Sequence, residues 1–137
     1  RNKFKNAQII AVDTSTEMLD VARKFSNANA KFIWGDAETV QLPNPVDLIT
    51  IMFAFHEIPQ HGRLKILKNA RDNLTEDGKL LVVDIDTSYK PSRMMLSGEP
   101  YVLDYIKNIR SDIMSIFPIV QEKVPVKGHV RQWLLSK

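Results

Sequence analysis

The chain has 137 residues, of which 44% are hydrophobic and 26% are charged. This balance is typical of a globular protein with one buried core, so we expect a single domain over residues 1–137. The absence of cysteine excludes disulfides and thiolate metal sites, and we expect no metal site. The net charge of +3 comes from scattered Lys and Arg, which argues against a nucleic-acid partner.

No apolar run approaches the roughly 20 residues that a bilayer-spanning helix needs. No secretory signal opens the sequence either. We therefore expect no membrane span and a cytoplasmic location.

The first predicted unit is a strand followed by a helix. Residues 8–13 form a short apolar run that ends in Asp13, which is typical of a buried parallel strand. Thr14 and Glu17 have the spacing of a capping box at the start of the helix. The apolar side chains predicted to share one face of this helix are Met18, Ala22 and Phe25.

Two further strand predictions and a helix follow. Residues 31–34 and 47–53 are short apolar runs, and residues 63–74 show helical periodicity. Gly78 is predicted to close a turn before a fourth strand over 79–85. The buried face of the helix is predicted to consist of Leu67, Ala70 and Leu74.

The remainder has a different pattern. Residues 88–100 are rich in Ser, Pro and Gly and are predicted to form a loop, and residues 101–117 a long helix. The short link at 125–128 joins predicted strands at 119–124 and 129–135 in an antiparallel hairpin. The apolar stripe of the helix is Val102, Ile106, Ile109, Ile113 and Phe117. The alternation before the hairpin indicates an α/β fold with a mostly parallel sheet covered by helices on both faces.

Two acidic residues follow predicted strands. Asp13 ends the first strand and Asp36 lies just past the second, where open parallel sheets bind ligands. The Asp13 carboxylate can accept hydrogen bonds from a ribose diol. Asp36 can accept from an exocyclic amine while the backbone N–H of Ala37 donates to a ring nitrogen. Each acid is equally typical of a helix cap or a turn.

The exit of the third strand carries the candidate reactive group. His56 is a candidate general base, because free histidine titrates near about pH 6.5, although capping of the next segment is the more common role. Glu57 is expected to orient or cap. Asp84 and Asp86 end the fourth strand; they are candidates for lining the acceptor pocket, although capping or a solvated position is the more common role. Tyr101 is a candidate cover for the substrate pocket.

Taken together in order, these segments resemble the class I, Rossmann-like, S-adenosylmethionine-dependent methyltransferases. The matching stretches are 11–19 with 22–23, 35–37 with 42–43, 47–53 with 56–59, and 71–84. Within that family the ubiquinone and menaquinone C-methyltransferases are the most similar type. The resemblance covers nearly the whole chain and includes the closing hairpin.

The resemblance implies roles for the cofactor residues. Asp13 would bind the ribose hydroxyls of S-adenosylmethionine, with Thr14 and Met18 flanking the adenosine. Asp36 and Ala37 would recognise the adenine.

The resemblance also implies roles around the methyl group. Phe53 would contact the cofactor near its methionine part through its backbone. Phe55, His56 and Tyr101 would face a small or lipophilic acceptor, with His56 as the catalytic base.

One family feature is absent. No glycine precedes Gly35 and no Gly-x-Gly occurs, so the family's first strand and its glycine-rich loop are missing. In the family order this strand lies between the strands at Ile9 and Ile49. We therefore expect an N-terminally incomplete domain whose sheet is completed by a longer natural chain or by another chain.

Two other functions fit part of this pattern. The missing loop favours a degenerate methyltransferase fold that acts as a non-catalytic binding or assembly subunit. Asp13 also suits the ribose of a nicotinamide cofactor in an oxidoreductase. The Gly-Asp-Ala turn and the C-terminal hairpin argue against the oxidoreductase.

Overall fold

The computed structural model describes residues 6–26 and 29–137. The chain divides into two compact units, Arg1–Val40 and Gln41–Lys137, which we treat separately. No helix within the described ranges is both long enough and apolar enough to cross a membrane.

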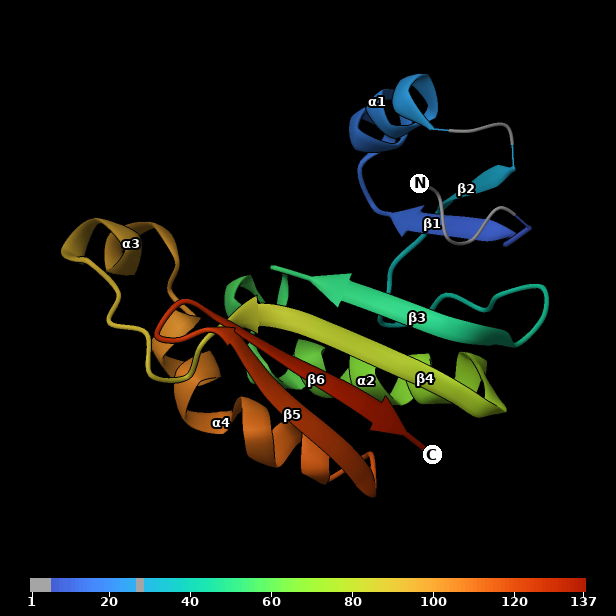
Figure 1. The fold of residues 1–137 in the computed structure, drawn as a ribbon. Coiled ribbons are helices and arrows are strands. Elements are labelled where there is room, and N and C mark those ends of the chain that lie inside the picture. The colour runs from blue at the N-terminus through green and yellow to red at the C-terminus, as the bar shows by residue number, and fades with distance from the viewer. Residues whose placement is uncertain (1–5, 27–28) are drawn as a thin grey trace. The chain divides into compact units, whose positions relative to one another are not determined.

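The first unit is a β-α-β element. The strands β1 (Ile9–Asp13) and β2 (Ala30–Trp34) pair in parallel, and α1 (Thr16–Phe25) connects them (Figure 1). Ser15, one residue later than predicted, is the N-cap of α1: its hydroxyl oxygen accepts a hydrogen bond from the backbone N–H of Met18.

The predicted apolar face of α1 was wrong. Leu19 is the only buried residue of this helix, whereas the Phe25 side chain is 86% exposed. Two strands offer too narrow a surface to cover a full helical face, so the side chains that periodicity assigned to a core remain in solvent.

The second unit contains a four-stranded sheet in the order β3-β4-β6-β5. Its strands are β3 (Val46–Met52), β4 (Leu74–Ile85), β5 (Ile119–Val126) and β6 (Val130–Ser136). β3 is parallel to β4, whereas β6 runs antiparallel to both β4 and β5. The predicted α/β fold with a C-terminal antiparallel hairpin is confirmed, and the sheet of this unit is mixed.

Three helices and a short 3-10 turn connect these strands. The turn η1 (Phe55–Glu57) and the helix α2 (Gln60–Asn73) lie between β3 and β4, and α4 (Val102–Met114) precedes β5. A short helix α3 (Arg93–Gly98) lies in the segment predicted as a loop. Ser92 caps it by accepting from the backbone N–H of Met95, a local signal that the Ser-, Pro- and Gly-rich composition masked.

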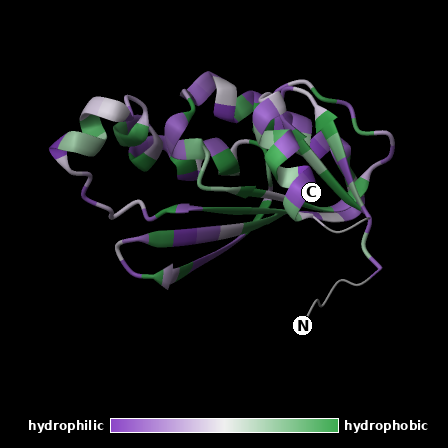
Figure 2. Ribbon diagram, turned by 90° about the horizontal axis from the view of Figure 1, so that it is seen from above, coloured by the Kyte–Doolittle hydropathy of each residue, from purple (hydrophilic) through white to green (hydrophobic). Residues whose placement is uncertain are grey.

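The core of this unit lies between its sheet and the helices α2 and α4, which are on the same side in Figure 1. Leu80 and Val82 on β4 and Trp133 and Leu135 on β6 are fully buried there. Their neighbours on the opposite face remain partly exposed, so within this unit the predicted covering of both faces is not observed. Apolar and polar residues alternate along the helices, as Figure 2 shows.

Gly78 lies inside β4 instead of in a turn. A Cβ atom at this position would lie 3.0 Å from the backbone oxygen of Thr75 and 3.0 Å from Cδ2 of Leu74. The register of β4 against β3 is irregular at this point. A side chain at position 78 would therefore collide with Leu74 and Thr75, which explains why a glycine is found there.

Candidate functional site

Asp13 and Asp36 lie at the same end of the β1-β2 pair. Asp13 is the register partner of Trp34, and Asp36 follows Trp34 by two residues. The backbone N–H of Gly35 donates to the carbonyl oxygen of Asp13 over 3.1 Å. The structure therefore brings both predicted acids to the carboxyl end of two paired parallel strands.

Each of these acids uses one carboxylate oxygen locally. Oδ1 of Asp13 accepts from the backbone N–H of Ser15 over 2.8 Å, and Oδ1 of Asp36 accepts from that of Glu38 over 2.8 Å. These are the turn bonds that the alternative interpretation predicted. Within the described chain the second oxygen of each accepts no hydrogen bond, both residues are exposed, and neither joins an ion pair. Both remain able to accept from a ligand.

The surroundings of these acids include one aromatic residue that sequence analysis missed. The Trp34 indole N–H donates to the carbonyl oxygen of Thr14 over 2.9 Å, although the side chain is 70% exposed. Met18 is also exposed, while Ala37 lies in the exposed turn after β2. The position of Trp34 directly before the Gly-Asp-Ala turn was the sequence signal that could have identified it as a site residue.

His56 lies in a buried pair with Asp84. Nδ1 of His56 is 2.6 Å from Oδ1 of Asp84, whose side chain is completely buried. Oδ2 of Asp84 accepts from the backbone N–H groups of Phe55 and His56, at 2.9 and 3.4 Å. The carboxylate therefore holds both the imidazole ring and the start of η1. The expectation that Asp84 is solvated was wrong, whereas its capping role is observed.

Tyr105 borders the same pair. Its ring meets the imidazole of His56 edge-on, with the ring centroids 6.2 Å apart. Its hydroxyl donates to the carbonyl oxygen of Ile85 over 2.9 Å. Burial, followed by the nearby negative charge of Asp84, raises the pKa of Tyr105 far above its ordinary value, so this hydroxyl stays neutral.

The carboxylate of Asp86 is buried and is held by hydrogen bonds from neighbouring residues. It is 1% exposed and accepts hydrogen bonds from Ser88, Gly128 and Arg131. Burial alone would raise the pKa of this carboxyl, but these donors outweigh it and hold the pKa well below the ordinary value. The predicted solvated or pocket-lining role of Asp86 is replaced by an ion pair with Arg131 that anchors the β5-β6 turn.

The remaining predicted residues differ in exposure. Phe53 is half-exposed and has a φ of +50°, a left-handed conformation that is uncommon for a bulky side chain. Tyr101 is partly exposed at the start of α4. Phe55, the first residue of η1, is fully buried in the core, contrary to the expectation that its side chain faces an acceptor.

Glu57 and Glu99 approach the free side of His56. Glu99, which precedes α4 and was not singled out from the sequence, places Oε2 3.6 Å from Nε2 of His56. Oε1 of Glu57 lies 3.8 Å from the same nitrogen. The sequence around Glu99 contains no pattern that predicts its proximity to His56.

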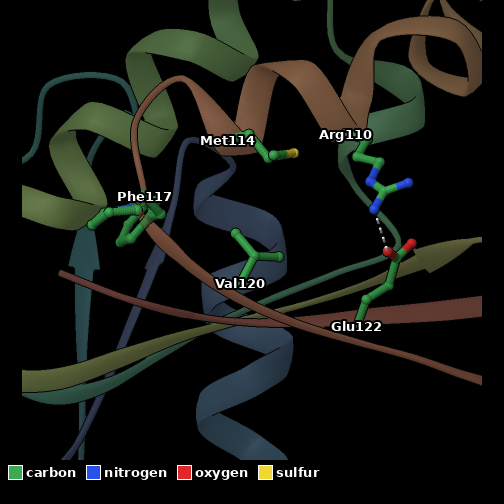
Figure 3. A pocket seen from close by; sticks show the side chains of 6 residues that line it. Arg110, Met114, Phe117, Val120 and Glu122 are labelled. Atoms are coloured by element: carbon green, nitrogen blue, oxygen red, sulfur yellow. Dashed lines mark ion pairs between the residues drawn. The ribbon is translucent and has the colours of Figure 1, made fainter.

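A separate groove of about 200 Å³ lies between α4 and β5 (Figure 3). Arg110 and Glu122 form an ion pair of 3.8 Å beside it. The residues that line it are Arg110, Met114, Phe117, Pro118, Val120 and Glu122. None of the predicted site residues is among them, so the groove is not part of the candidate site.

The first unit has two paired parallel strands, and an exposed acid lies at the carboxyl end of each. The second unit adds another parallel strand pair and an antiparallel hairpin. Together these features define a Rossmann-like ligand-binding fold. A family model described as a methyltransferase domain matches residues 1–78, more than half of the chain. The chain therefore belongs to the methyltransferase domain family.

Individual relatives agree with this assignment. An "uncharacterized methyltransferase" of Staphylococcus carnosus (strain TM300) is 30% identical over 105 residues, which are 77% of this chain and 45% of that protein. The chain thus spans less than half of this relative.

Solved structures support the fold. The LepI structure in complex with SAM matches all of this chain and 39% of its own, with a TM-score of 0.70 and 12% identity. The glycopeptide N-methyltransferase MtfA, complexed with (S)-adenosyl-L-methionine, matches over 95% of this chain and 72% of its own, with a TM-score of 0.69 and 14% identity. The fold is that of a partial Rossmann-like methyltransferase domain.

Proposed function

We propose that the natural protein transfers a methyl group from S-adenosylmethionine to a small or lipophilic acceptor. The observation that supports this most strongly is the pair of exposed carboxylates at the ends of β1 and β2, each with one oxygen uncommitted. In a parallel sheet this edge is where nucleotides bind. Because the chain belongs to the methyltransferase domain family, we propose S-adenosylmethionine as the ligand that binds there.

The residues of the first unit suit an adenosine group. In this proposal Asp13 accepts hydrogen bonds from the two ribose hydroxyls, and Asp36 and Ala37 recognise the adenine edge. Met18 and the indole of Trp34 offer exposed apolar surface beside them, with Thr14 held by the bond to Trp34. The flat adenine base can pack against such an exposed apolar surface.

The strained backbone at Phe53 supports its proposed contact with the methionine part of the cofactor. Non-glycine residues in the left-handed region cost of order 1 kcal/mol or more and gather at functional sites. The N–H of Phe53 donates to the carbonyl oxygen of Val83 over 2.8 Å, which fixes this conformation.

The cofactor, when bound, supplies an already activated methyl group, so the protein mainly has to align the acceptor and exclude water. An acceptor hydroxyl or acidic carbon must also lose a proton. We propose that Nε2 of His56 takes it, because the Asp84 carboxylate holds Nδ1 and stabilises the imidazolium that forms. Tyr101 and the exposed Met94 of α3 provide apolar cover for a lipophilic acceptor of the quinone type.

Titration of the natural protein with S-adenosylhomocysteine tests the cofactor site. We expect Asp13→Asn to weaken binding about 10- to 100-fold, because a charged hydrogen bond contributes about 1.5–3 kcal/mol. The matched control is Asp77→Asn, a change at an exposed acid in β4 that should bind as the parent does. If the parent protein binds no S-adenosylhomocysteine, the non-catalytic subunit becomes the better interpretation.

Methyl transfer from labelled S-adenosylmethionine to a panel of phenol and quinol acceptors tests the base. We expect His56→Gln to lower kcat about 10²- to 10⁴-fold with little change in KM. The control, His61→Gln, alters an exposed histidine of α2 and should keep full activity. Equal activity of the His56 variant and the parent would remove His56 from the chemistry.

A further inference from the structure

The three groups around Nε2 of His56 have the composition of a metal site. Nε2, Oε1 of Glu57 and Oε2 of Glu99 all lie within 4.8 Å of one another. They come from η1 and from the residue that precedes Pro100 and α4, so two separate segments converge on one point. One imidazole nitrogen and two carboxylates form a common ligand set for divalent transition metals.

One of these groups has a buried oxygen without a hydrogen-bond partner, and it faces a largely buried histidine. Oε2 of Glu99 is buried and has no hydrogen-bond partner. The His56 side chain is only 9% exposed, and its Nε2 makes no hydrogen bond with any described residue. A buried carboxylate oxygen without a partner is costly, and an ion shared with Nε2 of His56 would satisfy it.

The spacing of these atoms fits a shared ion better than a direct hydrogen bond. The separations of 3.6 and 3.8 Å from Nε2 exceed the usual N–H···O range, which ends near about 3.2 Å. Two ligands that each lie about 2.1 Å from one ion at tetrahedral or wider angles are about 3.4–3.7 Å apart. Small side-chain movements would complete this geometry.

Asp84 gives the site the support that metal-bound histidines usually have. Its carboxylate holds Nδ1 at 2.6 Å, which fixes the tautomer that carries the proton on Nδ1 and turns the Nε2 lone pair toward the two glutamates. Because Asp84 also binds two backbone N–H groups, the ring orientation is tied to the fold of η1.

We propose that His56, Glu57 and Glu99 bind one divalent transition-metal ion of the Zn²⁺ or Mn²⁺ type. The imidazole ligand disfavours Mg²⁺ and Ca²⁺, which take oxygen ligands. Three protein ligands leave at least one coordination position open. This inference goes beyond the methyl-transfer proposal: an ion on Nε2 occupies the lone pair that a proton would otherwise take, so the metal-bound form has no free base at His56.

The test uses the natural protein after dialysis against a chelator. Calorimetric titration with Zn²⁺ should show one ion bound per chain, and Co²⁺ should give the visible absorption bands of a bound ion. Glu99→Gln and Glu57→Gln should each weaken Zn²⁺ binding by at least about 10-fold. Glu76→Gln, a change at an exposed glutamate of β4, is the matched control and should leave the affinity unchanged.

Both glutamate side chains are partly exposed, so these isosteric changes should preserve the fold, and thermal unfolding without metal checks this. Parent-like Zn²⁺ affinity in both variants, or no binding by the parent, would overturn the proposal. S-adenosylhomocysteine binding in the same samples rests on Asp13 and Asp36. A failure of the metal site is therefore distinguishable from a failure of the proposed function.

Discussion

At the level of residues, the buried carboxylates of Asp84 and Asp86 have different roles because they bind different cationic or basic side chains. Asp84 is the penultimate residue of β4, and Asp86 follows the end of this strand by one residue. Asp86 pairs with the guanidinium of Arg131, whereas Asp84 pairs with the imidazole of His56. The first pair holds the β5-β6 turn, and the second fixes the orientation of the imidazole ring.

The depressed pKa of Asp86 predicts a pH-dependent contribution to stability. Its folded pKa lies below the unfolded value of about 3.9, so its contribution is fully present above that pH and is lost as the pH falls toward the folded pKa. We expect Asp86→Asn to lower the free energy of unfolding by about 1–3 kcal/mol near neutral pH. Urea unfolding of both proteins at several pH values measures the difference.

The difference between parent and Asp86→Asn should shrink steadily once the pH falls below about 4. A difference that is constant across the acid range would mean that the Asp86 charge contributes nothing to folding.

At the level of elements, α2 and α4 are joined by a buried ion-pair cluster as well as by their apolar faces. Arg63 is completely buried and donates to Asp112 at 3.0 and 3.1 Å and to Asp104 at 2.7 Å. It also donates to the carbonyl oxygen of Ile58. Arg63 therefore fixes both helices against the segment that follows η1, and so supports the position of His56.

Removal of Arg63 should be strongly destabilising. Arg63→Met leaves the buried carboxylate of Asp112 without its cation, which we expect to cost about 3–5 kcal/mol. Arg71→Met, a change at an exposed arginine of the same helix, should alter stability by less than about 0.5 kcal/mol. Denaturant unfolding compares them, and similar midpoints for both variants would show that the cluster does not hold the helices together.

Periodicity and turn chemistry predicted the strands, the two helices α2 and α4, the antiparallel hairpin and the acids at the ends of β1 and β2. These features depend on neighbours within one segment, which a sequence displays. The burial of Phe55, the Asp84–His56 pair and the approach of Glu99 depend on segments about 28 to 43 residues apart in the chain, as in the bond between Asp84 and His56. Such pairings appear only once the fold is known.

At the level of the whole molecule, the described strands form two sheets. β1 pairs only with β2, and β3 pairs with β4 at one end of its sheet. Ile9 and Leu48 on these edge strands are about half exposed. Exposed apolar edges attract further strands. We propose that residues outside this chain, from a longer natural protein or from a partner, supply a strand that completes the sheet.

A crystal structure of the natural protein with S-adenosylhomocysteine tests the central claim most directly. We expect the ribose hydroxyls within hydrogen-bond distance of the Asp13 carboxylate, and the adenine beside Asp36 and Ala37. A nucleoside bound elsewhere, with both carboxylates still in solvent, would contradict the account.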